Sequence, residues 1–156
     1  MKKFKFRLEP VLKLKKQAED EKKRIVGELL AKINTQQQQA LEINQTILQQ
    51  GAEMKKMFEQ GNVDLGWIAY YQSYVTDMRQ EIARKIQNVT ETQRELIQAR
   101  AELANAARET KTLEKIKEKQ YQKYKKHLEN LEKKELDEVA SQTFLHKYMR
   151  EPAELA

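Results

Sequence analysis

The 156-residue chain contains no cysteine, only four glycines and only two prolines. Without cysteine it can form no disulfide, no thiolate nucleophile and no Cys-ligated zinc site. Few residues that break helices are present, and with 35% charged residues and a mean hydropathy of −0.90 the composition is typical of long helices or coiled coils. So polar a chain could also be disordered. The periodicity of its apolar residues has to decide between the two.

Long hydrophobic runs are also missing. No stretch approaches the roughly 20 consecutive apolar residues that a membrane span requires. The charged start Met1–Phe4 is not followed by the apolar segment of a secretory signal. We therefore expect a soluble, cytoplasmic protein.

Apolar residues recur at helical spacing in two long segments separated by a break. The first segment predicts an amphipathic helix over about residues 10–60 and the second a helix over about 65–150, which Pro152 ends. In the break at about 61–66, Gly61 can close the first helix and Asp64 can cap the second. The first row is Ala18, Ile25, Leu29, Ile33, Ala40, Ile43, Ile47, Met54 and Phe58, and the second is Ile68, Tyr71, Val75, Met78, Ile82, Ile86, Val89, Leu96, Leu103, Leu113, Tyr124, Leu128, Leu131 and Leu136.

Two helices joined by a short turn return antiparallel. The predicted fold is therefore all-α, a long two-helix antiparallel coiled-coil hairpin forming a single domain over residues 1–156. A turn centred near residues 63–64 would place residue i beside about residue 127 − i, and thus Ile33 near Gln93 or Leu96. Residues after about 127 would overhang the first helix.

Positive charge is concentrated in two segments. Residues 1–24 hold ten Lys or Arg against four Asp or Glu, which accounts for the net charge of +6, and residues 111–134 hold nine against four. The predicted pairing brings both segments to the open end of the hairpin. This basic end could bind an acidic protein surface, could bind nucleic acid, or could simply be a solvated face.

Aromatic residues are frequent at the start of the second helix. Trp67, Tyr70 and Tyr74 follow a stripe beside the predicted core row. Exposed aromatics in a row commonly mark an interaction site. They could equally wrap around Met54, Met57 and Phe58 to cover the turn.

Nothing in the sequence predicts catalysis. His127 and His146 are the only histidines, and a glycine-rich phosphate loop is missing. A two-helix hairpin also offers no closed pocket in which a pKa could be shifted strongly. We therefore expect a binding protein without cofactor or metal, and not an enzyme.

Four segments resemble one known family. They are Phe4–Lys16 (FKFRLEPVLKLKK), Tyr71–Met78 (YQSYVTDM), Leu113–Lys119 (LEKIKEK) and Glu132–Ala140 (EKKELDEVA). In sequence and in order along the chain they are similar to FliJ, the small coiled-coil component of the bacterial flagellar type III export apparatus. The resemblance implies a non-catalytic cytoplasmic protein that resembles the central stalk of rotary ATPases.

The resemblance also implies partners. Such a protein would bind the flagellar export ATPase hexamer and promote its assembly or activity, contact the cytoplasmic linker of the export gate, and escort flagellar export chaperones. It would meet the inner-membrane apparatus only through these partners and would bind no nucleic acid. The implied ATPase-binding residues at the open basic end are Phe4, Phe6, Arg7, Leu8, Val11, Lys13, Lys15, Lys16, Lys115, Lys117 and Lys119. The implied gate-binding residues, on the exposed side of the early second helix, are Tyr70, Tyr74, Met78, Glu81 and Lys85.

Other functions remain open on the sequence. The chain could be the equivalent stalk of a virulence-type secretion system or of a proton-translocating rotary ATPase. It could also be a generic coiled-coil scaffold or secretion chaperone without an ATPase partner. A nucleic-acid binder would differ from all of these in an affinity that falls steeply with salt.

Overall fold

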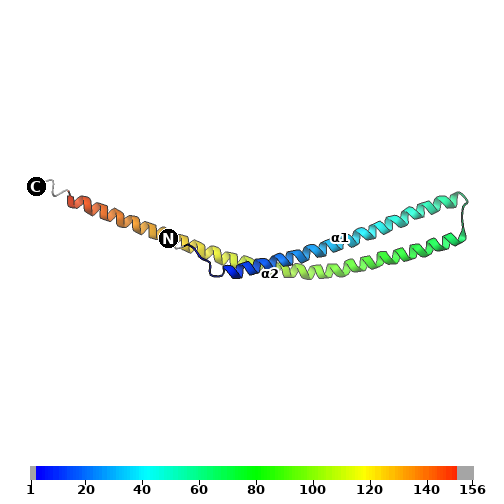
Figure 1. The fold of residues 1–156 in the computed structure, drawn as a ribbon, viewed down its shortest axis with the longest axis horizontal. Helices are drawn as coiled ribbons and strands as arrows, with labels where there is room; N and C mark the ends of the chain where they lie inside the picture. Colours follow the sequence, from blue (N-terminus) through cyan, green and yellow to red (C-terminus); the bar gives the residue numbers. More distant parts are fainter. Residues whose placement is uncertain (1–2, 151–156) are drawn as a thin grey trace. The chain divides into compact units, whose positions relative to one another are not determined.

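A computed structural model describes residues 3–150, and within them the chain forms two long helices (Figure 1). Helix α1 spans Glu9–Glu59, where the sequence predicts about 10–60, and α2 spans Leu65–Arg150, where it predicts about 65–150. The described residues contain no strand. The two helices pack against each other as a hairpin, so the predicted all-α fold class is confirmed. Pro152, which the sequence predicts to end the second helix, lies outside the described residues.

The turn between the helices is made by Gly61 and Asp64. The Gly61 amide donates to the Phe58 carbonyl at 3.2 Å, and its φ of 76° lies in the left-handed region that favours glycine. Asp64 Oδ1 accepts a hydrogen bond from the Gly66 amide at 3.0 Å, while the Asp64 carbonyl accepts one from the Ile68 amide at 3.1 Å. Both bonds are those of a helix N-cap. The predicted roles of Gly61 and Asp64 are confirmed.

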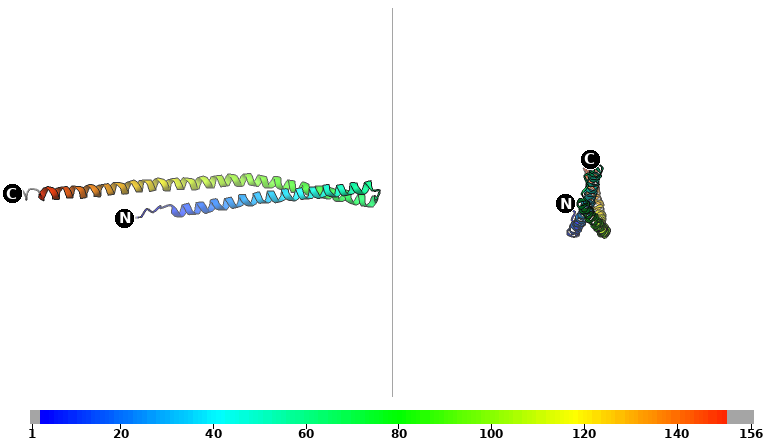
Figure 2. Two further views of the ribbon diagram at one scale, coloured as in Figure 1. Left: turned by 90° about the horizontal axis from the view of Figure 1, so that it is seen from above. Right: turned by 90° about the vertical axis from the view of Figure 1, so that its right-hand side faces the viewer.

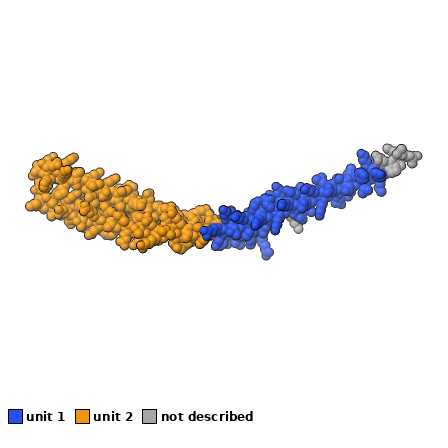
Figure 3. All heavy atoms as spheres, turned by 180° about the vertical axis from the view of Figure 1, so that it is seen from behind, with its two compact units in different colours: residues 1–15, 108–156 blue, residues 16–107 orange. Residues whose placement is uncertain are grey.

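The chain divides into two compact units (Figure 3). Unit 1 combines residues 1–15 with residues 108–156, and unit 2 consists of residues 16–107. Unit 2 holds the turn and the stretches of α1 and α2 that adjoin it. There, the cyan part of α1 runs alongside the green part of α2 (Figure 2).

In unit 2 the residues that face the other helix alternate in spacing between three and four. We call these residues the seam. On α1 they are Glu19, Lys22, Val26, Leu29, Ile33, Gln36, Ala40, Ile43, Ile47, Gln50 and Met54, and on α2 Ile68, Tyr71, Val75, Met78, Ile82, Lys85, Val89, Thr92, Leu96, Ala99, Leu103 and Ala106; all are buried or half-buried. This spacing is the 3.5-residue period of a coiled coil. Ile33, Val89 and Leu96 form its buried cluster, with Leu29 packed against it, so the predicted proximity of Ile33 and Leu96 is confirmed.

In unit 2, four residues of the predicted apolar rows lie outside the seam. Ala18 is exposed, Phe58 is 65% exposed, Ile86 is 56% exposed, and Ile25 is half-buried beside the seam residue Val26. The prediction followed apolar residues through steps of three and four in any order. A coiled coil requires strict alternation instead, so the seam passes through polar residues such as Lys22 and Lys85.

The register of the hairpin differs slightly from the predicted one. Side chains bond across the two helices from Lys15 to Glu109, from Lys22 to Glu102 and from Lys85 to Gln39, and the residue numbers of each pair add up to 124. The predicted sum was 127. The difference arises because α1 ends at residue 59 and α2 begins at residue 65, which centres the turn earlier than expected.

Unit 1 has its own small core. Leu12 is 2% exposed, Phe6 is 7% exposed and Thr110 is 4% exposed. Beyond this core every α2 residue from 129 to 150 is exposed, in the part of the helix for which the sequence predicts an overhang.

Candidate protein-binding surfaces

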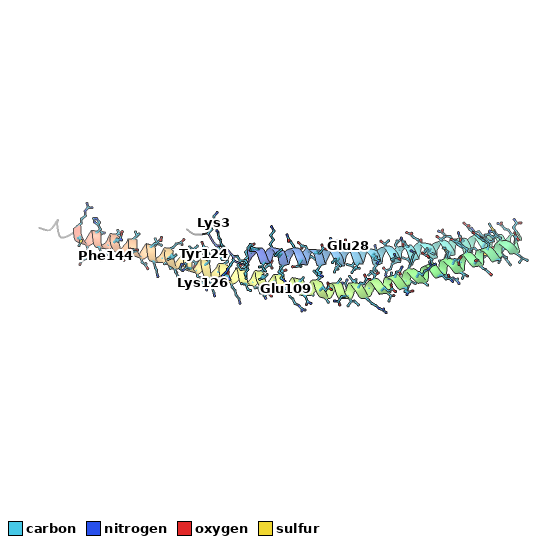
Figure 4. All side chains as sticks on the ribbon, turned by 60° about the horizontal axis from the view of Figure 1, so that its bottom comes forward. Lys3, Glu28, Glu109, Tyr124, Lys126 and Phe144 are labelled. Carbon is cyan, nitrogen blue, oxygen red and sulfur yellow. The ribbon has the colours of Figure 1, made fainter. Side chains whose placement is uncertain are left out.

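The segment before α1 packs against α2 in unit 1. The Phe4 ring lies 5.4 Å from the Tyr121 ring, edge to face, and 5.5 Å from the Tyr124 ring. Phe6 is buried, and the Lys117 ammonium group lies 6.0 Å from the centre of its ring. Figure 4 labels Tyr124 and two further residues of unit 1, Lys3 and Lys126. Phe4 and Phe6 therefore anchor the start of the chain on α2.

Local backbone bonds then direct the chain into α1. The Glu9 amide donates to the Phe6 carbonyl at 3.1 Å, and the Leu12 amide donates to the Leu8 carbonyl at 2.9 Å. Pro10, in the first turn, has no N–H to satisfy, and the negative charge of Glu9 suits a helix N-terminus. As a result Leu12 points into the core, while Leu8 and Val11 are 36% and 42% exposed.

Two of the basic residues expected to face the ATPase are held in ion pairs inside unit 1. Lys117 Nζ lies 2.7 Å from Glu9 Oε2, and Lys15 Nζ lies 2.5 Å from Glu109 Oε2 (Figure 4 labels Glu109). Sequence reasoning missed both pairs. The antiparallel register is the signal that could have found the second, because residues 15 and 109 add up to 124.

The other predicted basic residues present their charge to solvent. Arg7, Lys13, Lys115 and Lys119 are exposed, and so is Lys16, which also has an interaction partner within the chain. All except Lys16 belong to unit 1, so the structure brings residues 3–15 of the N-terminal basic segment into one unit with the 111–134 basic segment, while Lys16 and residues 22–24 belong to unit 2. Unit 1 also exposes Leu8 and Val11. The surface therefore combines positive charge with exposed apolar side chains.

The aromatic residues at the start of α2 divide between packing and exposure. The Trp67 ring stacks on the Tyr71 ring at 5.8 Å, and the Tyr71 hydroxyl donates to the Ile47 carbonyl at 3.3 Å. Tyr70 is 71% exposed, and Tyr74 is half-buried. Trp67 thus packs on Tyr71 but remains 41% exposed, and Tyr70 faces solvent. A groove of about 250 Å³ lies between them, lined by Gln50, Glu53, Met57, Trp67, Tyr70, Tyr71 and Tyr74.

The remaining gate candidates are not all on the exposed side of α2. Met78 and Lys85 occupy seam positions; the Lys85 side chain is 17% exposed and its Nζ donates to Gln39 Oε1 at 2.9 Å. The expectation that these two side chains are exposed is wrong, because both face α1. Glu81 is half-buried beside the seam, with Arg84 at 3.4 Å and Lys85 at 3.6 Å.

Within residues 3–150 no group of three or more His, Cys, Asp or Glu side chains is placed to hold a metal ion. No helix in residues 3–150 is long and apolar enough to cross a membrane.

Comparison with known proteins identifies one family. The family model described as "Flagellar FliJ protein" matches residues 4–148, which is nearly the whole chain. Neither the curated proteins nor the solved structures yield a match.

Proposed function

Because the chain belongs to the flagellar FliJ protein family, a component of the flagellar export apparatus, we propose that it acts there as a non-catalytic partner of the export ATPase. It binds the ATPase hexamer and promotes the assembly or activity of the ring. The family match over residues 4–148 is the observation that carries this proposal. It also favours the flagellar system over a virulence-type system and over a generic scaffold.

The ATPase contact lies on unit 1. Arg7, Lys13, Lys115 and Lys119 supply positive charge there, and the exposed Leu8 and Val11 supply apolar contact area. An acidic surface of the ATPase would be attracted over a distance and then fixed by the apolar side chains. Lys15 and Lys117 contribute differently. Their ion pairs with Glu109 and Glu9 join the N-terminal segment of this surface to α2, and Phe4 and Phe6 act in the same way by packing on α2.

The test is steady-state ATP hydrolysis by the export ATPase of the same organism with and without this protein. The double variant Lys13→Glu/Lys119→Glu reverses two exposed charges of unit 1 and should reduce stimulation on the order of tenfold at low salt. Lys55→Glu/Lys56→Glu reverses two exposed charges near the turn and serves as the matched control. Equal stimulation by both variants, with helicity unchanged, would contradict the assignment of this surface.

The contact with the cytoplasmic linker of the export gate lies on the early part of α2. Tyr70 is the most exposed aromatic residue there, and Tyr74 and Glu81 lie along the same side of the helix. Tyr70→Ala/Tyr74→Ala should weaken binding of a purified gate linker while ATPase stimulation is retained. Tyr148→Ala removes an equally exposed tyrosine of α2 and should have no effect on the linker.

Escort of export chaperones completes the proposed function. Through its partners alone the protein would be held at the inner-membrane apparatus. Co-elution of the purified chain with individual flagellar chaperones tests this part. Failure of every chaperone to bind would limit the function to the ATPase and the gate.

A further inference from the structure

The groove of about 250 Å³ at the turn end of unit 2 combines aromatic rings with a single carboxylate. Four of its seven lining residues are aromatic, and Glu53 is the only charged one; the remaining two are Gln50 and Met57. Lys55 and Lys56, which follow on the same helix, are not among the lining residues. The charge of the groove is therefore negative.

The aromatic wall of the groove is fixed by contacts within the chain. The Tyr71 hydroxyl donates to the Ile47 carbonyl of α1 at 3.3 Å, and the Trp67 ring stacks on the Tyr71 ring with 14° between the two planes. A Cβ at Gly51 would lie 3.2 Å from the Tyr71 hydroxyl oxygen, so glycine leaves room for this contact. A groove whose wall is already fixed loses less entropy when a ligand enters it.

The carboxylate of Glu53 selects the charge of the ligand. Within residues 3–150 this exposed carboxylate makes no ion pair or hydrogen bond. An apolar side chain entering the groove would remove Glu53 from water without replacing its hydrogen bonds, which is costly. An anion would be repelled by Glu53 and by the negative faces of the aromatic rings. A cation is attracted by both.

The size and shape of the groove favour an arginine side chain. Its volume of about 250 Å³ lies below the roughly 300–1,000 Å³ of pockets for larger ligands, so it suits one long side chain. A guanidinium group is planar, stacks on aromatic faces and is more weakly hydrated than an ammonium group. It can also donate two parallel hydrogen bonds to one carboxylate.

We propose that this groove binds an arginine side chain of a partner protein, with the guanidinium group against the aromatic rings and paired with Glu53. Tyr70 and Tyr74 line the groove and also belong to the proposed gate contact. The inference therefore deepens that contact, and it rests on the proposed function only for the identity of the partner. The chemistry of the groove can be tested without the gate or the ATPase.

The first experiment uses Trp67, the single tryptophan of the chain, as a fluorescent reporter. Titration of the full-length protein with the capped tripeptide Gly-Arg-Gly should give a saturable change in emission, with a Kd on the order of 1–10 mM for so small a ligand. The same tripeptide with citrulline, the uncharged analogue of arginine, should give no saturable change. Absence of saturation with the arginine peptide, or an equal response to citrulline, would overturn the proposal.

The second experiment removes the carboxylate from the groove. Glu53→Gln keeps the size of the side chain and should raise the Kd for the arginine peptide by on the order of tenfold. Glu59→Gln is the matched control, because it removes an exposed carboxylate near the end of α1 that does not line the groove. The control should leave the Kd unchanged. Equal effects of the two substitutions would contradict the pairing with Glu53.

The third experiment separates the aromatic face from simple apolar area. Tyr70→Phe retains a ring and should retain binding, while Tyr70→Leu should raise the Kd by about threefold. Tyr70 is 71% exposed, so circular dichroism should show unchanged helicity in both variants. Equal Kd values for the two variants would show that the ring does not hold the guanidinium group.

Failure of this inference and failure of the proposed gate contact give different results. If the arginine peptide does not bind while the gate linker still requires Tyr70 and Tyr74, only the arginine site is wrong. If the peptide binds in the expected way while Tyr70→Ala/Tyr74→Ala leaves linker binding unchanged, the arginine site stands and the gate contact is wrong.

Discussion

Two stretches of α1 face α2 with different chemistry. From Val26 to Ile47 the seam is mainly apolar and contains the buried cluster around Ile33. From Glu19 to Lys22 it is charged, and Lys22 bonds Glu102 at 2.6 Å. The three–four spacing is the same in both. The period of the sequence therefore decides which residues face the other helix. The chemistry of those residues decides how much each contributes to the stability of the hairpin.

Apolar and charged seam residues differ widely in how much they stabilise the hairpin. Burial of a leucine-sized side chain stabilises by about 1.5–3 kcal/mol. An ion pair that stays in contact with water stabilises by about 0–1 kcal/mol, and the side chains of Lys22 and Glu102 remain 36% and 44% exposed. Most of the stability of the hairpin should therefore come from the apolar stretch. Four predictions test this comparison, from the largest expected effect to the smallest.

A charge placed in the apolar stretch should have the largest effect. Leu96 is 6% exposed, and Leu96→Asp should lower the free energy of unfolding by about 3–5 kcal/mol, because it removes the buried side chain and introduces an unpaired carboxylate. Leu136→Asp makes the same change in the same helix at a residue that is 69% exposed, and should cost less than about 0.5 kcal/mol. Thermal unfolding followed by circular dichroism measures both. Similar losses of stability at the two positions would contradict the assignment of Leu96 to the seam.

An exchange of residue types between the two stretches should have opposite effects. Leu29→Lys should destabilise by about 1–2 kcal/mol, because Leu29 packs against the cluster of Ile33 and Leu96. Lys22→Leu should be neutral or stabilising, because the ion pair that it removes is solvated while the leucine gains contact with α2. Urea unfolding of both variants gives the comparison. A larger loss of stability for Lys22→Leu than for Leu29→Lys would show that the charged stretch stabilises the hairpin more than the apolar stretch does.

Two glycines inside α1 should respond differently to the same substitution. A Cβ on Gly27 would meet nothing within 4 Å, so Gly27→Ala should stabilise by about 0.5–1 kcal/mol. A Cβ on Gly51 would lie 3.2 Å from the Tyr71 hydroxyl oxygen, which donates to the Ile47 carbonyl. Gly51→Ala should therefore gain less or lose stability. In a Tyr71→Phe background, which lacks that oxygen, the gain from Gly51→Ala should reappear.

The smallest effect concerns pH. The Lys22 ammonium group, followed by the Gln98 amide, donates to Glu102 and lowers the pKa of that carboxyl below its ordinary value. A carboxyl whose pKa is lower in the folded state contributes stability above its unfolded pKa and loses it as the pH falls through the folded pKa. Glu102→Gln should therefore slightly reduce the fall in Tm between neutral and acidic pH. An unchanged or larger fall in Tm would show that the Lys22–Glu102 ion pair contributes nothing to the acid sensitivity of the fold.

Much of the fold could be predicted from sequence because its signals are local. Gly61 and Asp64 act within a few residues of themselves, and the periodicity of each helix is written along its own length. The register and the polar seam positions could not be predicted from apolar residues alone. Lys22 and Lys85 look like surface residues in the sequence, and only their places in the three–four alternation bring them to the seam.

The candidate surfaces could likewise be predicted only in part. Sequence reasoning located the basic segments and the aromatic start of α2. It did not find that Glu9 and Glu109 pair with Lys117 and Lys15, or that Lys85 bonds Gln39. These pairs join residues far apart in the chain, so they depend on the register.

The sequence by itself determined two long helices, the turn between them and the concentration of positive charge in two segments, because helix propensity, capping and periodicity act between near neighbours. Only the tertiary structure decided which side chains face each other. Packing in this register decides which residues form the seam, which lie beside it and which face away from the other helix. The groove lined by Glu53 of α1 and Trp67 and Tyr70 of α2 becomes one site only when the two helices lie together.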